Sequence, residues 1–196
     1  MWLKLSAIAV GVIIVIAIFS TAFPKNQEPF IAMGLLGKYL RADNYYPNNS
    51  STISVGTQVR WGIYLYNHMS DTKNISIKVK LLNATQPGPN DQNRTSSPAD
   101  AFMTIPLTLL PNETRIMAFA FSITGIVPGD SFLRVTSIDV NYHTYSVDVI
   151  QQEGTRLRLL FELWSLDSAN KPIFSWKSAD TGRAVWNQML FSVTSS

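Results

Sequence analysis

Residue types that usually carry catalysis or bind metals are scarce in this sequence. It contains two histidines, His68 and His143, and no cysteine. Thiolate metal sites, disulfides and cysteine nucleophiles are therefore excluded, and two histidines alone leave a zinc site without its usual further ligands. Neither a G-x-S-x-G nucleophile elbow nor a phosphate-binding glycine loop is present. We predict that the protein is not an enzyme and has no catalytic residues, cofactor or metal centre.

One short run of oxygen-bearing side chains is dense enough to suggest a cation site. Asn90-Asp91-Gln92-Asn93 lies within a polar stretch, residues 86–100, that is rich in Pro, Asn and Ser. The run lacks the glycine and the terminal glutamate of an EF-hand calcium loop. A long exposed loop is the simpler interpretation of this stretch, and a calcium site is the alternative.

Asparagine carries the strongest chemical signal in the chain. With 13 Asn and 35 Ser or Thr among 196 residues, chance would give about two Asn-x-Ser/Thr sequons. N-glycosylation on exposed loops, which requires transfer across a membrane, would explain the excess. The alternative is that Asn, Ser and Thr share turns because their side chains bond the backbone there. The sequence has six sequons, of which the first two overlap, so we do not expect both of those to be used: Asn48, Asn49, Asn74, Asn83, Asn93 and Asn112.

Tyrosines form a second candidate site. Tyr45 and Tyr46 precede a turn, whereas Tyr64 and Tyr66 share one face of a predicted strand. An exposed row of such rings could stack on sugars or on a protein partner. The alternative is that a second sheet or a neighbouring strand covers them.

An apolar segment at the N-terminus determines on which side of a membrane these residues lie. Leu5 to Phe23 is a run of 19 residues without charge, and about 20 apolar residues in a helix cross a bilayer. Lys4 lies before the run, whereas Lys25 and Glu28 cancel after it. The positive-inside rule then places the N-terminus in the cytoplasm and the rest outside. We expect a membrane anchor over residues 1–25 and an extracytoplasmic domain over residues 26–196.

The same segment has a second interpretation, because Ser20-Thr21-Ala22 resembles a signal-peptidase site. The apolar run is longer than a typical signal-peptide core, which favours a retained single-pass anchor over cleavage after Ala22.

Charge argues against nucleic acid as a partner. The pI of about 9.2 is basic, but residues 26–196 carry 14 Lys and Arg against 13 acidic residues. No domain-wide basic field remains to attract a phosphate backbone.

Alternation of apolar and polar residues dominates the chain beyond residue 28 and predicts strands with one buried face. Turn residues interrupt these runs at intervals typical of an all-β protein. The fold class expected is an immunoglobulin-like antiparallel β-sandwich preceded by one N-terminal transmembrane helix. The predicted strands cover residues 30–36, 59–66, 75–81, 103–109, 117–123, 133–142, 145–150, 157–163, 172–176 and 185–193.

Several of these segments resemble the archaeal membrane-anchored domain-of-unknown-function family 1616. The similarity rests on the order of short motifs, and it implies an extracytoplasmic immunoglobulin-like domain on an archaeal surface with no established catalytic residues. Larger members of that family have several membrane segments, whereas this chain has one. The motifs are Tyr46-Pro47, Val55-Gly56, Tyr66-Asn67-His68, residues 79–83, residues 110–114, residues 119–121, residues 159–164 and Trp186-Asn187-Gln188.

Function is therefore expected at a cell membrane. The leading hypothesis is a glycosylated surface protein that acts as a structural or protein-interaction module, with cell-envelope proteins or a membrane complex as partners. A second hypothesis is a binding module for a sugar or small solute. A third is a subunit of a surface filament in which the stretch after the anchor adds a strand to a neighbouring sheet.

Overall fold

The computed structural model describes residues 29–166, 171–178 and 181–195, and the predicted anchor with its possible cleavage site lies outside them. The described residues form strands and two single 3₁₀ turns, η1 (Lys38–Leu40) and η2 (Pro47–Asn49). Within these residues no helix has the length and apolar character needed to cross a bilayer. The strands are β1 (Ile31–Leu36), β2 (Thr52–Ser54), β3 (Val59–Asn67), β4 (Lys73–Leu82), β5 (Met103–Leu109), β6 (Thr114–Pro128), β7 (Phe132–Val140), β8 (His143–Gln152), β9 (Leu157–Leu166), β10 (Pro172–Ile173), β11 (Trp176–Ser178), β12 (Thr181–Arg183) and β13 (Val185–Thr194).

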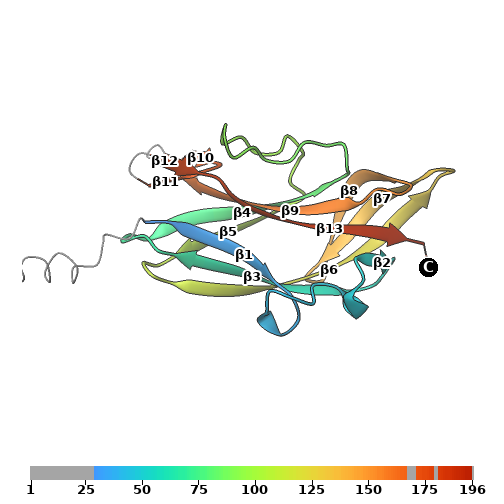
Figure 1. Cartoon of the computed structure of the whole chain (residues 1–196), viewed down its shortest axis with the longest axis horizontal. Coiled ribbons are helices and arrows are strands. Elements are labelled where there is room, and N and C mark those ends of the chain that lie inside the picture. The colour runs from blue at the N-terminus through green and yellow to red at the C-terminus, as the bar shows by residue number, and fades with distance from the viewer. Residues whose placement is uncertain (1–28, 167–170, 179–180, 196) are drawn as a thin grey trace, which may run out of the picture.

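Two sheets pack face to face, which confirms the predicted all-β sandwich (Figure 1). The first sheet has the order β1-β3-β6-β7-β8, and the second has the order β2-β13-β9-β4-β5 with β10 added to β9. Every pairing is antiparallel except that of β2 with β13. The orders β1-β3-β6 and β4-β9-β13 correspond to strands A-B-E and C-F-G of an immunoglobulin sandwich, and the β7–β8 hairpin widens the first sheet.

Alternate residues of the long strands point into the core between the sheets. On β3, Val59, Trp61, Ile63 and Leu65 are all buried. The indole of Trp61 lies within 4.9 to 6.3 Å of three phenylalanine rings, which come from β6 and β9: Phe119, Phe121 and Phe161. Burying side chains of this size stabilises the fold by about 1.5–3 kcal/mol each, and the period-two pattern of the sequence is explained by this core.

Three expectations about individual strands are wrong. The segment 172–176 is not one strand, because β10 ends at Ile173 and β11 begins at Trp176. The segment 133–142 ends as a strand at Val140, because Asn141 and Tyr142 have φ angles of 49° and 70° and form the turn of the β7–β8 hairpin. The polar residues of β9 do not all face solvent: Glu162 is fully buried, and Lys80 on β4, two residues beyond the one paired with Glu162, is buried as well.

The loop over residues 83–102 explains this burial, because it lies on the outer face of β4 and β9. Lys80 Nζ is 2.9 Å from Glu162 Oε2 and also donates to the Ser97 carbonyl oxygen at 2.6 Å. The Ser97 amide donates to Glu162 Oε1 at 2.7 Å. A buried ion pair therefore fastens the loop to the sheet, and the stretch predicted as exposed is exposed on one side only.

Candidate functional site

The sequons lie on turns, loops and one strand end of the sandwich. The side chain of Asn83 is half-buried, and the other five sequon asparagines are exposed. Asn48, Asn49 and Asn112 have φ angles of 54°, 56° and 57°, a left-handed conformation that asparagine tolerates better than most residues. Backbone geometry alone thus explains three of the six asparagines, and their glycosylation stays a prediction.

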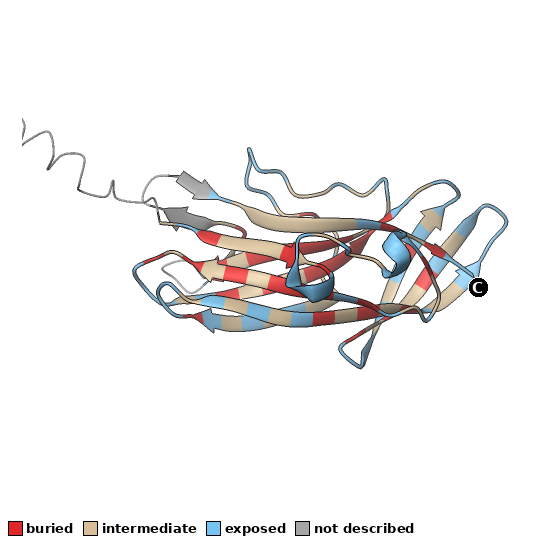
Figure 2. Cartoon of the chain, turned by 60° about the horizontal axis from the view of Figure 1, so that its bottom comes forward, coloured by how far each residue is buried: buried red, intermediate tan, exposed pale blue. Residues whose placement is uncertain are grey.

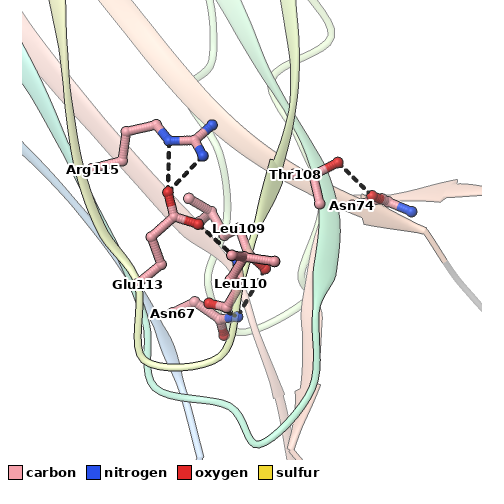
Figure 3. A network of polar contacts seen from close by, with 7 residues as sticks. All are labelled: Asn67, Asn74, Thr108, Leu109, Leu110, Glu113 and Arg115. Atoms are coloured by element: carbon pink, nitrogen blue, oxygen red, sulfur yellow. Dashed lines mark hydrogen bonds and ion pairs between the residues drawn. The ribbon is translucent and has the colours of Figure 1, made fainter.

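The sequon residues Asn74 and Asn112 lie beside a polar network around Asn67, at the end of the sandwich where β1 begins. Figure 3 shows this network with Asn74 next to it. At its centre Asn67 is fully buried, and its Nδ2 donates to the carbonyl oxygens of Asp71, Leu109 and Leu110 at 2.9–3.2 Å. Asn67 ends a strand of the first sheet, whereas Leu109 ends a strand of the second. One amide side chain therefore joins the two sheets at this end.

The turn that carries the sequon Asn112 is closed by the neighbouring Glu113. Its Oε2 accepts from the Leu110 amide at 2.7 Å, and its Oε1 accepts from Arg115 (Figure 3). The backbone hydrogen bond, followed by the one from Arg115, lowers the pKa of Glu113 below its ordinary value. Because the folded-state pKa is depressed, the carboxylate stabilises this turn above its unfolded-state pKa, and that stabilisation is lost as pH falls through the folded-state value.

Neither histidine belongs to a cluster of potential ligands. His68 Nδ1 is 2.9 Å from the Tyr66 hydroxyl, and the His68 ring packs against Phe30, whereas His143 is exposed at the start of β8. In the part of the chain that the structure describes, no group of three or more His, Cys, Asp or Glu could hold a metal ion.

The Asn90–Asn93 run forms a tight exposed turn. Asn90 pairs with Thr95 in an isolated bridge, and the Oδ1 of Asn90 accepts from the Asn93 amide at 2.9 Å. Asp91 Oδ1 accepts from Trp186 Nε1 at 2.5 Å. Two oxygens of the candidate calcium site thus already accept hydrogen bonds within the protein.

The four tyrosines fall into two separate pairs. Tyr64 and Tyr66 point to the outer face of β3 and are half-buried. Tyr45 and Tyr46 are also half-buried, and their hydroxyls donate to the Leu35 carbonyl at 3.1 Å and the Leu190 carbonyl at 2.7 Å. Burial raises the pKa of the Tyr46 phenol. A binding surface formed by the four tyrosines stays a prediction.

Tyr45 and Tyr46 instead line a groove that the sequence did not reveal. We call it the Trp61 groove, and its volume is about 380 Å³, within the range of small-molecule sites. It lies beside the loop that follows β1, which Figure 1 shows as a blue turn bulging away from the two sheets. The groove is lined by Gly37, Lys38, Tyr39, Leu40, Asn44, Tyr45, Tyr46, Pro47, Gln58, Arg60 and Trp61.

The loop that forms this groove is strained. Five non-glycine residues between positions 39 and 49 have positive φ angles: Tyr39, Leu40, Asn44, Asn48 and Asn49. Left-handed conformations cost about 1–2 kcal/mol for residues with a bulky side chain. Tyr39 and Leu40 nevertheless remain 77% and 56% exposed, and Figure 2 shows both 3₁₀ turns in the exposed colour. Burial does not offset the strain, so the loop presents these two side chains to solvent at a cost in stability.

Specific contacts hold the loop in this conformation. Gly37 donates from its amide to the Arg41 carbonyl at 2.7 Å, and a Cβ at position 37 would lie 2.1 Å from the Asp43 carbonyl oxygen. Trp61 Nε1 donates to the Tyr45 carbonyl at 2.6 Å. The same indole that packs in the core thus anchors the loop, which makes the groove a preformed feature.

The charged groups at the groove are mainly cationic. Lys38 Nζ lies 4.9 Å from the centre of the Tyr39 ring, and Arg60 donates from Nε to Gln58 Oε1 at 2.7 Å. Arg41, next to the groove, pairs with Asp43 at 3.3 Å. No carboxylate lines the groove, and neither Lys38 nor Arg60 is paired with an acid among the described residues. The site therefore suits a ligand with a flat apolar face and a negative group.

Replacing the strained tyrosine with glycine tests whether the loop conformation is costly. We expect Tyr39→Gly to raise the free energy of unfolding by roughly 0.5 kcal/mol, because relief of left-handed strain exceeds the added entropy of the unfolded chain. Tyr142, which is 91% exposed with a φ of 70°, is a matched control and should gain a similar amount when changed to glycine. Urea unfolding of the detergent-solubilised chain measures both. A loss of 1 kcal/mol or more in Tyr39→Gly alone would contradict the strain argument.

Comparison with solved structures finds similar chains. No protein-family model and no curated protein sequence matches the chain. The CARDB domain of the PF1109 protein from Pyrococcus furiosus, solved in complex with di-metal ions, is similar at 9% sequence identity and a TM-score of 0.43. That match covers 88% of this chain and all of the other. The resemblance to family 1616 stays a prediction.

The sequence carried only a weak signal for the groove. Lys38, Tyr39 and Leu40 follow a glycine directly after a strand, where small turn-forming residues would be expected. Two large apolar residues at that point are out of place in an exposed turn. The sequence did not indicate that Arg60 and Gln58 line the groove, because they lie beside the loop only in the folded structure.

Proposed function

We propose that this protein is a single-pass, N-glycosylated cell-surface protein whose immunoglobulin-like sandwich lies outside the membrane and binds envelope components through the Trp61 groove. The anchor is supported by the uncharged run Leu5–Phe23 and by Lys4 before it. The resemblance to family 1616 supports an archaeal surface. The observation that carries the binding role is the strained loop, which holds Tyr39 exposed above a preformed groove.

The groove also favours the narrower hypothesis of a module for sugars or small solutes, because its size suits such ligands. The filament hypothesis is less well supported. It requires removal of the apolar segment, and β1, the first described strand after that segment, pairs along its whole length with β3 of its own chain. Strand donation would require these pairs to break first.

Photocrosslinking in intact cells tests the binding role. A photoreactive phenylalanine analogue replaces Tyr39 in one variant and the even more exposed Tyr142, which lies outside the groove, in a control. We expect heavier crosslinked species from position 39 and few from position 142. Equal yields from the two positions, or none from either, would remove the groove as the binding site.

Glycosylation is tested by mass spectrometry of peptides from membrane-extracted protein. We expect glycan-bearing peptides at exposed sequons, Asn112 foremost, because its turn leaves the side chain open to solvent. Asn44 is exposed but lies outside any sequon, so it should be unmodified and serves as the control. Six unmodified sequons in protein from its native cells would count against the extracytoplasmic location.

A further inference from the structure

We propose that the Trp61 groove binds an acidic saccharide, meaning a sugar unit that carries a carboxylate or a sulfate. This inference rests on the proposed function, which supplies a location where envelope sugars are present. It adds the chemical class of the ligand and the residues that select it.

Aromatic rings supply the apolar part of the site. Tyr39, Tyr45, Tyr46 and Trp61 all line the groove. The face of an aromatic ring is electron-rich and attracts the polarised C–H groups on the flat face of a pyranose. Tyr39 is the most exposed of these rings at 77%, and because Lys38 Nζ lies over one of its faces, we expect a sugar to stack on the other. The indole of Trp61 is 4% exposed and mainly forms the floor.

Cations supply the selectivity for negative charge. Lys38 and Arg60 line the groove, and no described carboxylate pairs with either of them. The bond from Arg60 Nε to Gln58 Oε1 at 2.7 Å fixes the side chain and leaves the two terminal nitrogens available. A guanidinium held in this way matches the two oxygens of a carboxylate or sulfate, whereas Lys38 adds a point charge.

Neutral polar groups and the size of the groove also fit a saccharide ligand. Asn44 and Gln58 line the same groove, and amide side chains can both donate to and accept from sugar hydroxyls. A groove of about 380 Å³ lies at the small end of ligand sites and suits roughly one or two sugar rings. The site is preformed, so binding should require little rearrangement.

Isothermal titration calorimetry of the detergent-solubilised full chain tests this assignment. The probes are a glucuronic acid tetrasaccharide, a glucose tetrasaccharide of equal length, a sulfated hexose oligomer and a tetraglutamate peptide. We expect both acidic saccharides to bind at least tenfold more tightly than the glucose oligomer and the peptide. The carboxylated and sulfated probes distinguish the two sources of negative charge.

Two variants and a control assign the binding to the groove. Tyr39→Gly removes the stacking ring and Arg60→Gln removes the guanidinium, and each should weaken binding at least tenfold. Tyr142→Gly should bind like the unmodified chain. Equal affinity for the acidic and neutral tetrasaccharides, equal affinity for tetraglutamate, or insensitivity to Tyr39→Gly would each overturn the proposal. Crosslinks from position 39 to a protein, together with no saccharide binding, would overturn it while leaving the proposed function standing.

Discussion

Replacing Lys80 with methionine should lower the free energy of unfolding by about 3–5 kcal/mol, the usual cost of leaving one partner of a buried ion pair alone. Methionine keeps most of the volume but removes the ammonium group 2.9 Å from Glu162. It also leaves the Ser97 carbonyl without the donor that fastens the 83–102 loop to the sheet. Urea unfolding of the solubilised chain gives the free energy directly.

A neighbouring lysine provides the matched control. Lys78 lies two residues earlier on β4, is half-buried, and its Nζ lies 3.5 Å from the centre of the Trp164 ring. Lys78→Met should cost no more than about 1 kcal/mol, the value of an exposed cation–π contact. The double change Lys80→Met with Glu162→Gln should recover part of the loss, because no uncompensated charge remains buried. Equal effects of the two lysine changes would show that the 83–102 loop does not bury Glu162.

Asn67→Asp should destabilise the protein by about 3 kcal/mol or more, although the side chains have nearly the same shape. Asparagine donates from Nδ2 to three carbonyl oxygens, whereas aspartate has no donor there and places a buried negative charge against the same oxygens. Thermal or urea unfolding reports the loss. Hydrogen exchange should show it first in the turns on both sides of Asn67, since this residue joins the two sheets (Figure 3).

The nearby sequon residue Asn74 is the control for this change. It lies on β4 with an exposed side chain whose Oδ1 accepts from the Thr108 hydroxyl at 2.7 Å (Figure 3). Asn74→Asp keeps that acceptor and should change stability by less than about 0.5 kcal/mol. If Asn67→Asp changed the stability as little as Asn74→Asp, Asn67 would not be the link between the sheets.

The sandwich could be predicted because its signal is local. Each strand buries one face, so a period of two is visible on β3, β4 and β5 without any knowledge of their partners. The burial of Glu162 could not be predicted in this way. Its covering residue Ser97 lies 65 positions earlier in the chain, and a polar loop that docks on a sheet resembles a loop that does not.

The groove was missed for a related reason. Tyr45 and Tyr46 were identified as binding candidates from their type alone, and the structure places both in the groove. Tyr64 and Tyr66 were grouped with them because they share one strand face, but sequence spacing does not show how far a loop reaches along that face. The left-handed conformation of Tyr39 and Leu40 opposes their intrinsic preference. Tertiary contacts through Gly37 and Trp61 impose it.

The proposed location of the sandwich outside the membrane can be tested directly, because the chain contains no cysteine. A single Tyr142→Cys change places a thiol at a position that is 91% exposed, and a membrane-impermeant maleimide is applied to intact cells and to lysed cells. We predict equal labelling before and after lysis, with all labelled protein in the membrane fraction. Labelling that appears only after lysis would place the sandwich inside the cell and contradict the proposed extracytoplasmic location.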